Sequence, residues 1–251
     1  MSSAWGQQAS AVRLDWGLRG ARELVAGGVS TVVVIDVLSF TTSVTVALER
    51  RTAVFPHPWD AASGAVVAAG LDAVCAVGRT AAGPGEISLS PASILAAESV
   101  ERLVLPSPNG SAICAWLADA GVDVVAGSFR NATSVGHWLA GRAGPVGVVA
   151  AGERWTDDGS LRMAVEDLWG AGAVVEALVA ARMATTVSPE ADAARAVYRE
   201  VHDDVLGSLS RCASGVELAQ KGFAADVAVA SDVDVSRVVP LLTDGWFRPA
   251  P

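Results

Sequence analysis

The chain has 251 residues, a length typical of single-domain α/β proteins, and 51% of them are apolar, which is enough for one core. Its formal net charge of −9 argues against a general surface for nucleic acid or for an anionic membrane, because both need clustered basic residues. No run approaches the roughly 20 apolar residues that cross a bilayer, and no basic start precedes an apolar core. We therefore expect one domain over residues 1–251, located in the cytoplasm.

Short runs rich in valine and alanine recur along the chain and predict strands. Helix-like segments with apolar spacing near 3.6 residues lie between most of them, which is typical of βαβ units. The sequence thus predicts an α/β fold, a three-layer α/β/α sandwich with a largely parallel or mixed sheet. The predicted strands cover residues 11–16, 31–36, 52–55, 72–77, 102–106, 122–127, 146–151 and 226–230.

Two segments interrupt this alternation. Residues 78–93 are rich in Gly, Ser and Pro and predict a long loop, and loops above about 12 residues are usually functional. Residues 163–206 predict two covering helices with a break near 185–191, where Ser188 precedes Pro189 as an N-cap signal.

The stretch TVVVIDVLSFTTSV, residues 31–44, places an acid directly after a run of β-branched residues. Val32 to Ile35 favour a strand covered on both faces, as in a parallel sheet flanked by helices. Because ionised carboxylates are rarely buried without a partner, Asp36 needs a helix N-terminus, a cation, a metal or an open position at the strand end. Asp36 is therefore the first candidate for a chemical role.

Polar residues follow four of the predicted strands. In open α/β sheets, ligands bind beyond the carboxyl ends of the strands, so these positions predict a site. Helix N-termini that point backbone amides into one cleft bind phosphate or carboxylate, and hydroxyls and arginines complete such a site. The candidates are Asp36, Ser39, Thr41 and Thr42 after 31–36; Asn109, Gly110 and Ser111 after 102–106; Ser128, Arg130 and Asn131 after 122–127; and Glu153 and Arg154 after 146–151.

Several of these residues also have an ordinary structural interpretation. Thr41, Asn109 and Ser128 are residue types that commonly cap helix N-termini. Asn109-Gly110 is a common turn dipeptide, although the apolar run after it favours a strand-to-helix connection over a hairpin. The four strand ends together are more informative than any one of them.

The adjacent acids Glu166 and Asp167 leave two interpretations open. Mg²⁺ needs hard oxygen ligands, usually one or two carboxylates with waters and substrate phosphate oxygens, and Asp36 with Glu166-Asp167 can supply them. Acids in the first turn of a helix are also stabilised by the helix dipole without any metal. Spacing alone does not decide between the two.

The order of the motifs resembles that of the 2-phosphosulfolactate phosphatase (ComB-like) family. Each motif is weak by itself, but the series is specific and runs from about Leu14 to Leu242. The motifs are VVVIDVLSFTTSVTVAL, LPSPNGSAI, GSFRNATSV, AGERWTDDGSLRMAVEDLWGAGAVV and ASGVELAQKGFAADVAVASDVDVSRVVPLL.

The resemblance implies a three-layer α/β/α enzyme that uses Mg²⁺ to hydrolyse 2-phospho-3-sulfolactate to sulfolactate and phosphate, a step in coenzyme M synthesis. It also implies which positions carry the family's functional residues. The matching positions are Asp36, Thr41-Thr42, Asn109-Gly110-Ser111, Asn131-Ala132, and Glu166-Asp167 with Ala171-Gly172.

A phosphatase mechanism assigns roles to these candidates. Asp36, Glu166 and Asp167 act as the catalytic acids and hold Mg²⁺, while Ser111 and residues 128–131 bind phosphate. Either water or Asp36 is the nucleophile, and we favour water, because no Asp-x-Asp pair supports an aspartyl-phosphate route. A second anionic group on the substrate goes to an arginine, with Arg79, Arg130 and Arg154 as the candidates.

The chain departs from the family pattern at two places. Many relatives have Asp-x-x-Arg-Ala-Thr, where this chain has Ser39 in place of the arginine, and Gly78-Arg79 stands for the usual Gly-Glu-Arg. A hydroxyl cannot clamp phosphate as a guanidinium does, so we expect Arg79 or Arg154 to face Asp36 instead.

Two other classes of function stay open at this point. One is a module that binds a phosphorylated ligand without catalysis, and the other is an α/β transferase or isomerase acting on another phospho-acid. In every case the expected partner is a small anionic phosphorylated molecule, with no nucleic acid and no membrane. A homodimer is kept as an expectation, since the sequence does not specify the oligomeric state.

Overall fold

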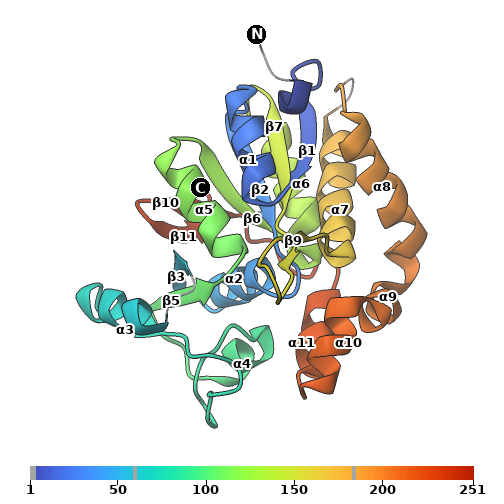
Figure 1. The fold of residues 1–251 in the computed structure, drawn as a ribbon. Helices are drawn as coiled ribbons and strands as arrows, with labels where there is room; N and C mark the ends of the chain where they lie inside the picture. The colour runs from blue at the N-terminus through green and yellow to red at the C-terminus, as the bar shows by residue number, and fades with distance from the viewer. Residues whose placement is uncertain (1–3, 59–60, 183–184) are drawn as a thin grey trace.

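The computed structural model describes residues 4–58, 61–182 and 185–251. Its centre is a nine-stranded sheet in the order β1-β7-β2-β6-β10-β11-β3-β5-β4 (Figure 1). The strands are β1 Val12–Trp16, β2 Thr31–Ile35, β3 Ala53–Pro58, β4 Val74–Cys75, β5 Arg102–Ser107, β6 Asp123–Gly127, β7 Val146–Ala150, β10 Pro240–Thr243 and β11 Trp246–Pro249.

The sheet is mixed because a C-terminal hairpin separates two parallel parts. β1, β7, β2 and β6 run parallel to their neighbours, as do β3, β5 and β4. β10 and β11 form an antiparallel hairpin that joins β6 on one side and β3 on the other. This arrangement confirms the predicted largely parallel or mixed sheet.

Helices cover both faces of the sheet, and each face has its own apolar core. Val32 and Val34 of β2 pack with side chains of α1, α2 and α5, whereas Val33 and Ile35 pack with α6, α7 and α8 (Figure 1). Successive strand side chains point to opposite faces, so a run of buried valines fills both cores. The three-layer α/β/α sandwich is thereby confirmed.

The helices follow the predicted alternation for most of the chain. Ser188 caps α8 by accepting a hydrogen bond from the amide of Ala191, as the Ser-Pro signal predicts. Within the described residues, no helix is both long and apolar enough to cross a membrane. The helices are α1 Gly17–Ala26, α2 Phe40–Glu49, α3 Ala61–Gly70, α4 Pro91–Ala96, α5 Gly110–Asp119, α6 Ala132–Ala140, α7 Val165–Ala181, α8 Pro189–Val201, α9 Val205–Arg211, α10 Ala213–Gln220 and α11 Ala224–Ser231.

The predicted strand at residues 226–230 is wrong, because this segment lies within α11. A short apolar run does not distinguish a strand from a buried helix turn. The sequence-based prediction missed the β10–β11 hairpin in the middle of the sheet, whose turn residues Asp244 and Gly245 both have positive φ, at 51° and 81°. Such Asp-Gly turns are a strong hairpin signal that the sequence reading overlooked.

Three segments outside the sheet surround the carboxyl end of β2. They are the loop of residues 76–90, the small hairpin of β8 (Glu153–Arg154) and β9 (Leu161–Arg162), and the helices α10 and α11. α11 contacts α4, which follows the loop (Figure 1). The strand ends therefore open into a space bordered by residues from distant parts of the chain.

Candidate active site

Asp36 follows β2 directly and is 7% exposed. One carboxylate oxygen accepts the amide of Phe40 at 3.1 Å, and the other accepts the amide of Gly110 at 3.0 Å. Burial raises the pKa of Asp36 above its usual value, and the charge of Glu166 adds to this, while the two amides and Arg79 oppose it. The start of α2 and the start of α5 thus both hold this carboxylate.

The hydroxyls of Thr41 and Thr42 shape the turn that carries Asp36. Thr41 Oγ1 accepts the amide of Asp36 at 3.0 Å and donates to its carbonyl at 2.9 Å. Thr42 Oγ1 donates to the carbonyl of Val37 at 2.8 Å. Both side chains are fully buried, so their contacts fix the backbone between β2 and α2.

Asp167, in the first turn of α7, connects two strand ends. Its carboxylate oxygens accept the amides of Val37 and Gly152, each at 2.8 Å. Burial, together with the charges of Asp36 and Glu166, raises the pKa of Asp167 well above its usual value. The carboxylate therefore joins the loop after β2 to the loop after β7.

Glu166 is 2% exposed and lies beside Cys212. Burial raises the pKa of the Cys212 thiol to about 12, and the charge of Glu166 adds to this effect. The Glu166 and Asp167 carboxylates are thus both buried at the start of α7.

Glu153, on β8, is a partly buried acid close to Asp36. Asn109 Nδ2 donates to its Oε2 at 2.9 Å. Burial is the largest cause that raises the pKa of Glu153 to about 7, and the charge of Asp36 is the next. The Glu153 carboxyl therefore holds a proton at higher pH than a free glutamate side chain does.

Arg79 reaches the same place from the long loop. Its guanidinium donates to the hydroxyl of Ser39 and pairs with Asp226 of α11 at 3.1 Å. The guanidinium carbon also lies 5.8 Å from the centre of the Phe223 ring. A cation thus lies next to Ser39, the position where the family resemblance described above implies an arginine.

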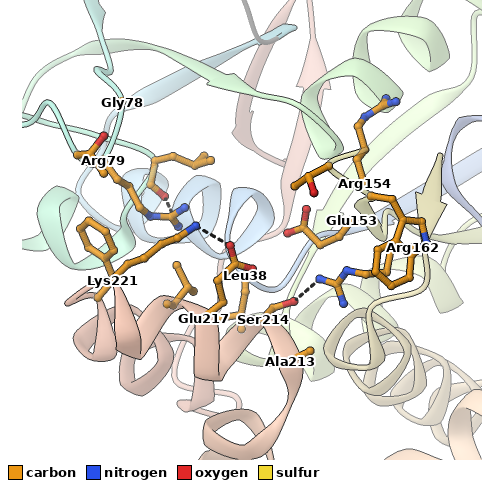
Figure 2. A pocket seen from close by; sticks show the side chains of 16 residues that line it. Leu38, Gly78, Arg79, Glu153, Arg154, Arg162, Ala213, Ser214, Glu217 and Lys221 are labelled. Atoms are coloured by element: carbon orange, nitrogen blue, oxygen red, sulfur yellow. Dashed lines mark hydrogen bonds and ion pairs between the residues drawn. The ribbon is translucent and has the colours of Figure 1, made fainter. Parts of the chain in front are cut away.

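These side chains border two connected cavities. A recess of about 220 Å³ is lined by Asp36, Ser39, Arg79, Asn109 and Glu153, among others. A wider cavity of about 690 Å³ shares Leu38, Arg79, Leu89 and Glu153 with the recess and extends to α10 (Figure 2). The acids and the arginine therefore meet where a small ligand has access.

A family model described as 2-phosphosulpholactate phosphatase matches residues 22–245, which is nearly the whole chain. The chain belongs to the 2-phosphosulpholactate phosphatase family. It is accordingly a phosphatase, a phosphoric monoester hydrolase. A search of curated proteins found no match.

In this phosphatase, part of the predicted phosphate-binding set makes contacts within the fold. Ser111 donates to the carbonyl of His57 at 2.7 Å, and Ser128 forms a reciprocal capping box with Asn131. Arg130 pairs with Glu49 at 3.1 Å and with Asp232 at 2.8 Å. These residues line neither the recess nor the wider cavity, whereas Ser39, Arg79, Asn109 and Glu153 line the recess.

Arg162 and Ser214 line the wider cavity of the phosphatase but are absent from the predicted site. Arg162 lies on β9, and Arg162 Nη2 donates to Ser214 Oγ of α10 at 3.1 Å. Both lie within motifs that carry the family resemblance, but nothing in these motifs singled them out as site residues, because their placement depends on the pairing of a two-residue hairpin. The exposed Arg154, which was predicted, lies on the partner strand of that hairpin.

A magnesium ion fits the recess only with help from the substrate. Among the described residues, no group of three or more His, Cys, Asp or Glu side chains is placed to hold a metal ion. Asp36 and Glu153 nevertheless both line the recess, and the pKa of each is raised by burial. Mg²⁺ commonly binds one or two carboxylates, with waters and phosphate oxygens completing its shell, so this donor set is suitable.

Proposed function

We propose that the protein hydrolyses the phosphate ester of 2-phosphosulfolactate, releasing sulfolactate and inorganic phosphate, and that it requires Mg²⁺ to do so. The family assignment supports the substrate. The structural observation that supports the site is that two acids, the buried Asp36 and the partly buried Glu153, line one recess together with Arg79. A recess of about 220 Å³ suits a phosphate group and a metal ion.

Arg79 is proposed to bind the phosphate. Its guanidinium is always charged and offers donors in a planar fork that matches phosphate oxygens. Asp226 and the Phe223 ring hold the side chain in place, so little rotamer freedom is lost when substrate binds.

Asp36 and Glu153 are proposed to hold Mg²⁺. This metal supplies charge neutralisation of the phosphate oxygens, which is the main requirement of phosphoryl transfer. The amides of Phe40 and Gly110 orient the Asp36 carboxylate. We favour water over Asp36 as the nucleophile, because Asp36 is not part of an Asp-x-Asp pair that would support an aspartyl-phosphate route.

The proposed function is tested by measuring phosphate release. The purified protein is incubated with 2-phosphosulfolactate, 2-phospholactate and the phosphoglycerates, in Mg²⁺ and in excess EDTA. We expect Mg²⁺-dependent release that is fastest with 2-phosphosulfolactate. Equal rates in EDTA would contradict the metal, and a higher kcat/KM for another ester would contradict the substrate.

A further inference from the structure

The pairing of β8 with β9 decides which side chains of this hairpin face the cavity. Glu153 pairs with Arg162, and Arg154 pairs with Leu161, in an antiparallel ribbon. Directly opposed residues project from the same face of such a ribbon, and successive residues project from opposite faces. Arg162 therefore lies on the face of Glu153, while Arg154 lies on the other.

Figure 2 agrees with this arrangement, since Arg162 reaches toward Ser214 whereas Arg154 points away from it. Leu161, which shares the face of Arg154, packs against Gly17 and Gly152. One face of the hairpin thus places the half-exposed Leu161 against these glycines, and the other face presents Glu153 and Arg162.

The charge of Arg162 has no ion-pair partner among the described residues, within 4.0 Å. Its hydrogen bond goes to the neutral hydroxyl of Ser214, and its guanidinium carbon lies 5.9 Å from the centre of the Trp155 ring. Two other cations of the cavity wall are already paired, Arg79 with Asp226 and Lys221 with Glu217. Arg154 also lines the cavity, but it lies on the opposite face of the hairpin and donates to the carbonyl of Gly159 at 3.3 Å. Arg162 is therefore a cation that faces the cavity without an acid to neutralise it among the described residues.

Arg79 and Arg162 border the same cavity from opposite sides, with Glu153 between them in the view of Figure 2. A ligand with a single compact anionic group can contact only one of the two guanidinium groups, because they lie on opposite sides of the cavity. A short molecule with an anion at each end can do so, because it offers each guanidinium a charged acceptor.

We propose that Arg162, positioned by Ser214, binds a second anionic group of the substrate, a sulfonate or a carboxylate, while the phosphate lies at Arg79. The inference rests on the proposed function and names the residues that select its substrate class, the phosphate monoesters of short hydroxy acids with a second strong anion. Arg162 is thus a specificity-determining residue. Arg154, one of the three arginines that the sequence suggested for the second anion, is not.

The first test compares two phosphate esters in steady-state kinetics. 2-Phosphosulfolactate carries the second anion, and glycerol 2-phosphate lacks it. In Arg162→Gln we expect KM for 2-phosphosulfolactate to rise roughly 10- to 100-fold, because the variant loses a charge-assisted hydrogen bond to the second anion. The kcat/KM for glycerol 2-phosphate should stay within twofold of the parent, because this ester has no second anion to lose. An equal loss of kcat/KM with both esters, or no loss with either, would overturn the assignment of Arg162.

Two further variants sharpen this comparison. Arg211→Gln is the matched control, because Arg211 is exposed on α9 and makes only a long contact of 3.7 Å to Asp204. It should behave as the parent with both esters. Arg154→Gln tests the rival arginine, and a selective rise in KM for 2-phosphosulfolactate in this variant, with Arg162→Gln unaffected, would overturn the proposal.

The second test needs no turnover and separates this inference from the proposed function. Calorimetry measures the affinity of 3-sulfolactate and of inorganic phosphate for the parent and for Arg162→Gln. We expect sulfolactate affinity to fall at least tenfold and phosphate affinity to stay within twofold. An unchanged sulfolactate affinity, or none in the parent, would overturn the subsite. Absence of phosphate release from every ester rejects the proposed function alone.

Discussion

The carboxylate of Asp36 accepts the backbone amide of Gly110 at 3.0 Å, and this contact joins the end of β2 to the first residue of α5. The contact depends on the absence of a side chain at Gly110. A Cβ atom there would lie 2.5 Å from Cδ1 of Phe40 and 2.7 Å from Oδ2 of Asp36. The glycine of the Asn-Gly dipeptide thus lets a helix N-terminus approach the acid closely.

Gly110→Ala is expected to displace Asp36 and lower kcat by more than tenfold. The overpacking should also cost about 1 to 3 kcal/mol in the free energy of unfolding. Phosphate release and denaturant unfolding measure the two effects. Gly70→Ala is the control, because Gly70 has open space around its Cβ position, and this variant should keep the parent's kcat. A parental kcat in Gly110→Ala would contradict a precise placement of Asp36.

The sequence was informative where a single stretch of chain sets the geometry. β-branched residues place Asp36 at a strand end, and Asn109-Gly110 forms the predicted connection from a strand to a helix. Ser188 caps α8 as its neighbour Pro189 suggests. In each case the signal and the structure lie within a few residues of each other.

The rest of the site depends on contacts that no local pattern encodes. Arg79 and Asp226 pair across 147 residues of chain, and Asp226 lies in a segment predicted as a strand. Arg162 faces the cavity only because of the register with Glu153. Roles that depend on such distant pairings become visible only when the fold is known.

Asp167 and Asp36 are predicted to respond differently to replacement by asparagine. Both lose an acceptor for a backbone amide, so each variant should be destabilised by about 1 to 3 kcal/mol. Only Asp36 lines the recess, so only Asp36→Asn should weaken Mg²⁺ binding in calorimetry, by tenfold or more. Weakened Mg²⁺ binding in Asp167→Asn at full folding would instead restore Asp167 as a ligand, as the sequence suggested.

Because Arg79 and Asp226 form an ion pair, replacing both residues should destabilise the protein less than replacing Arg79 alone. Asp226 is 1% exposed, so Arg79→Met should leave a buried charge without its cation and cost about 3 to 5 kcal/mol. Adding Asp226→Asn should recover part of this loss in denaturant unfolding, because the buried charge is gone. Arg79→Met should also raise KM for the phosphate ester, because it removes the proposed phosphate-binding cation, and the double variant should keep this raised KM. A KM that recovers together with stability would argue against Arg79 as the phosphate-binding residue.

Glu153 predicts how stability changes with pH. The pKa of its carboxyl is about 7 in the folded protein, against 4.5 for the free side chain, and burial is the main cause. Because the folded protein holds the Glu153 proton more tightly than the unfolded chain does, this group contributes to the free energy of unfolding. The contribution is fully present below pH 4.5 and is lost as the pH rises through 7.

Glu153→Gln should therefore gain stability over the parent as the pH rises from 4.5 to 8, by on the order of 3 kcal/mol in EDTA. The glutamine cannot ionise, so it avoids the cost of a buried charge beside Asp36. Denaturant unfolding across this pH range measures the difference, and Glu217→Gln, at an exposed acid paired with Lys221, should show no such trend. Mg²⁺ should raise the stability of the parent more at pH 8 than at pH 5, because the ion competes with the proton for Glu153. A pH-independent difference between Glu153→Gln and the parent would mean that the Glu153 carboxyl ionises normally, and that it does not lie close to Asp36 in the recess.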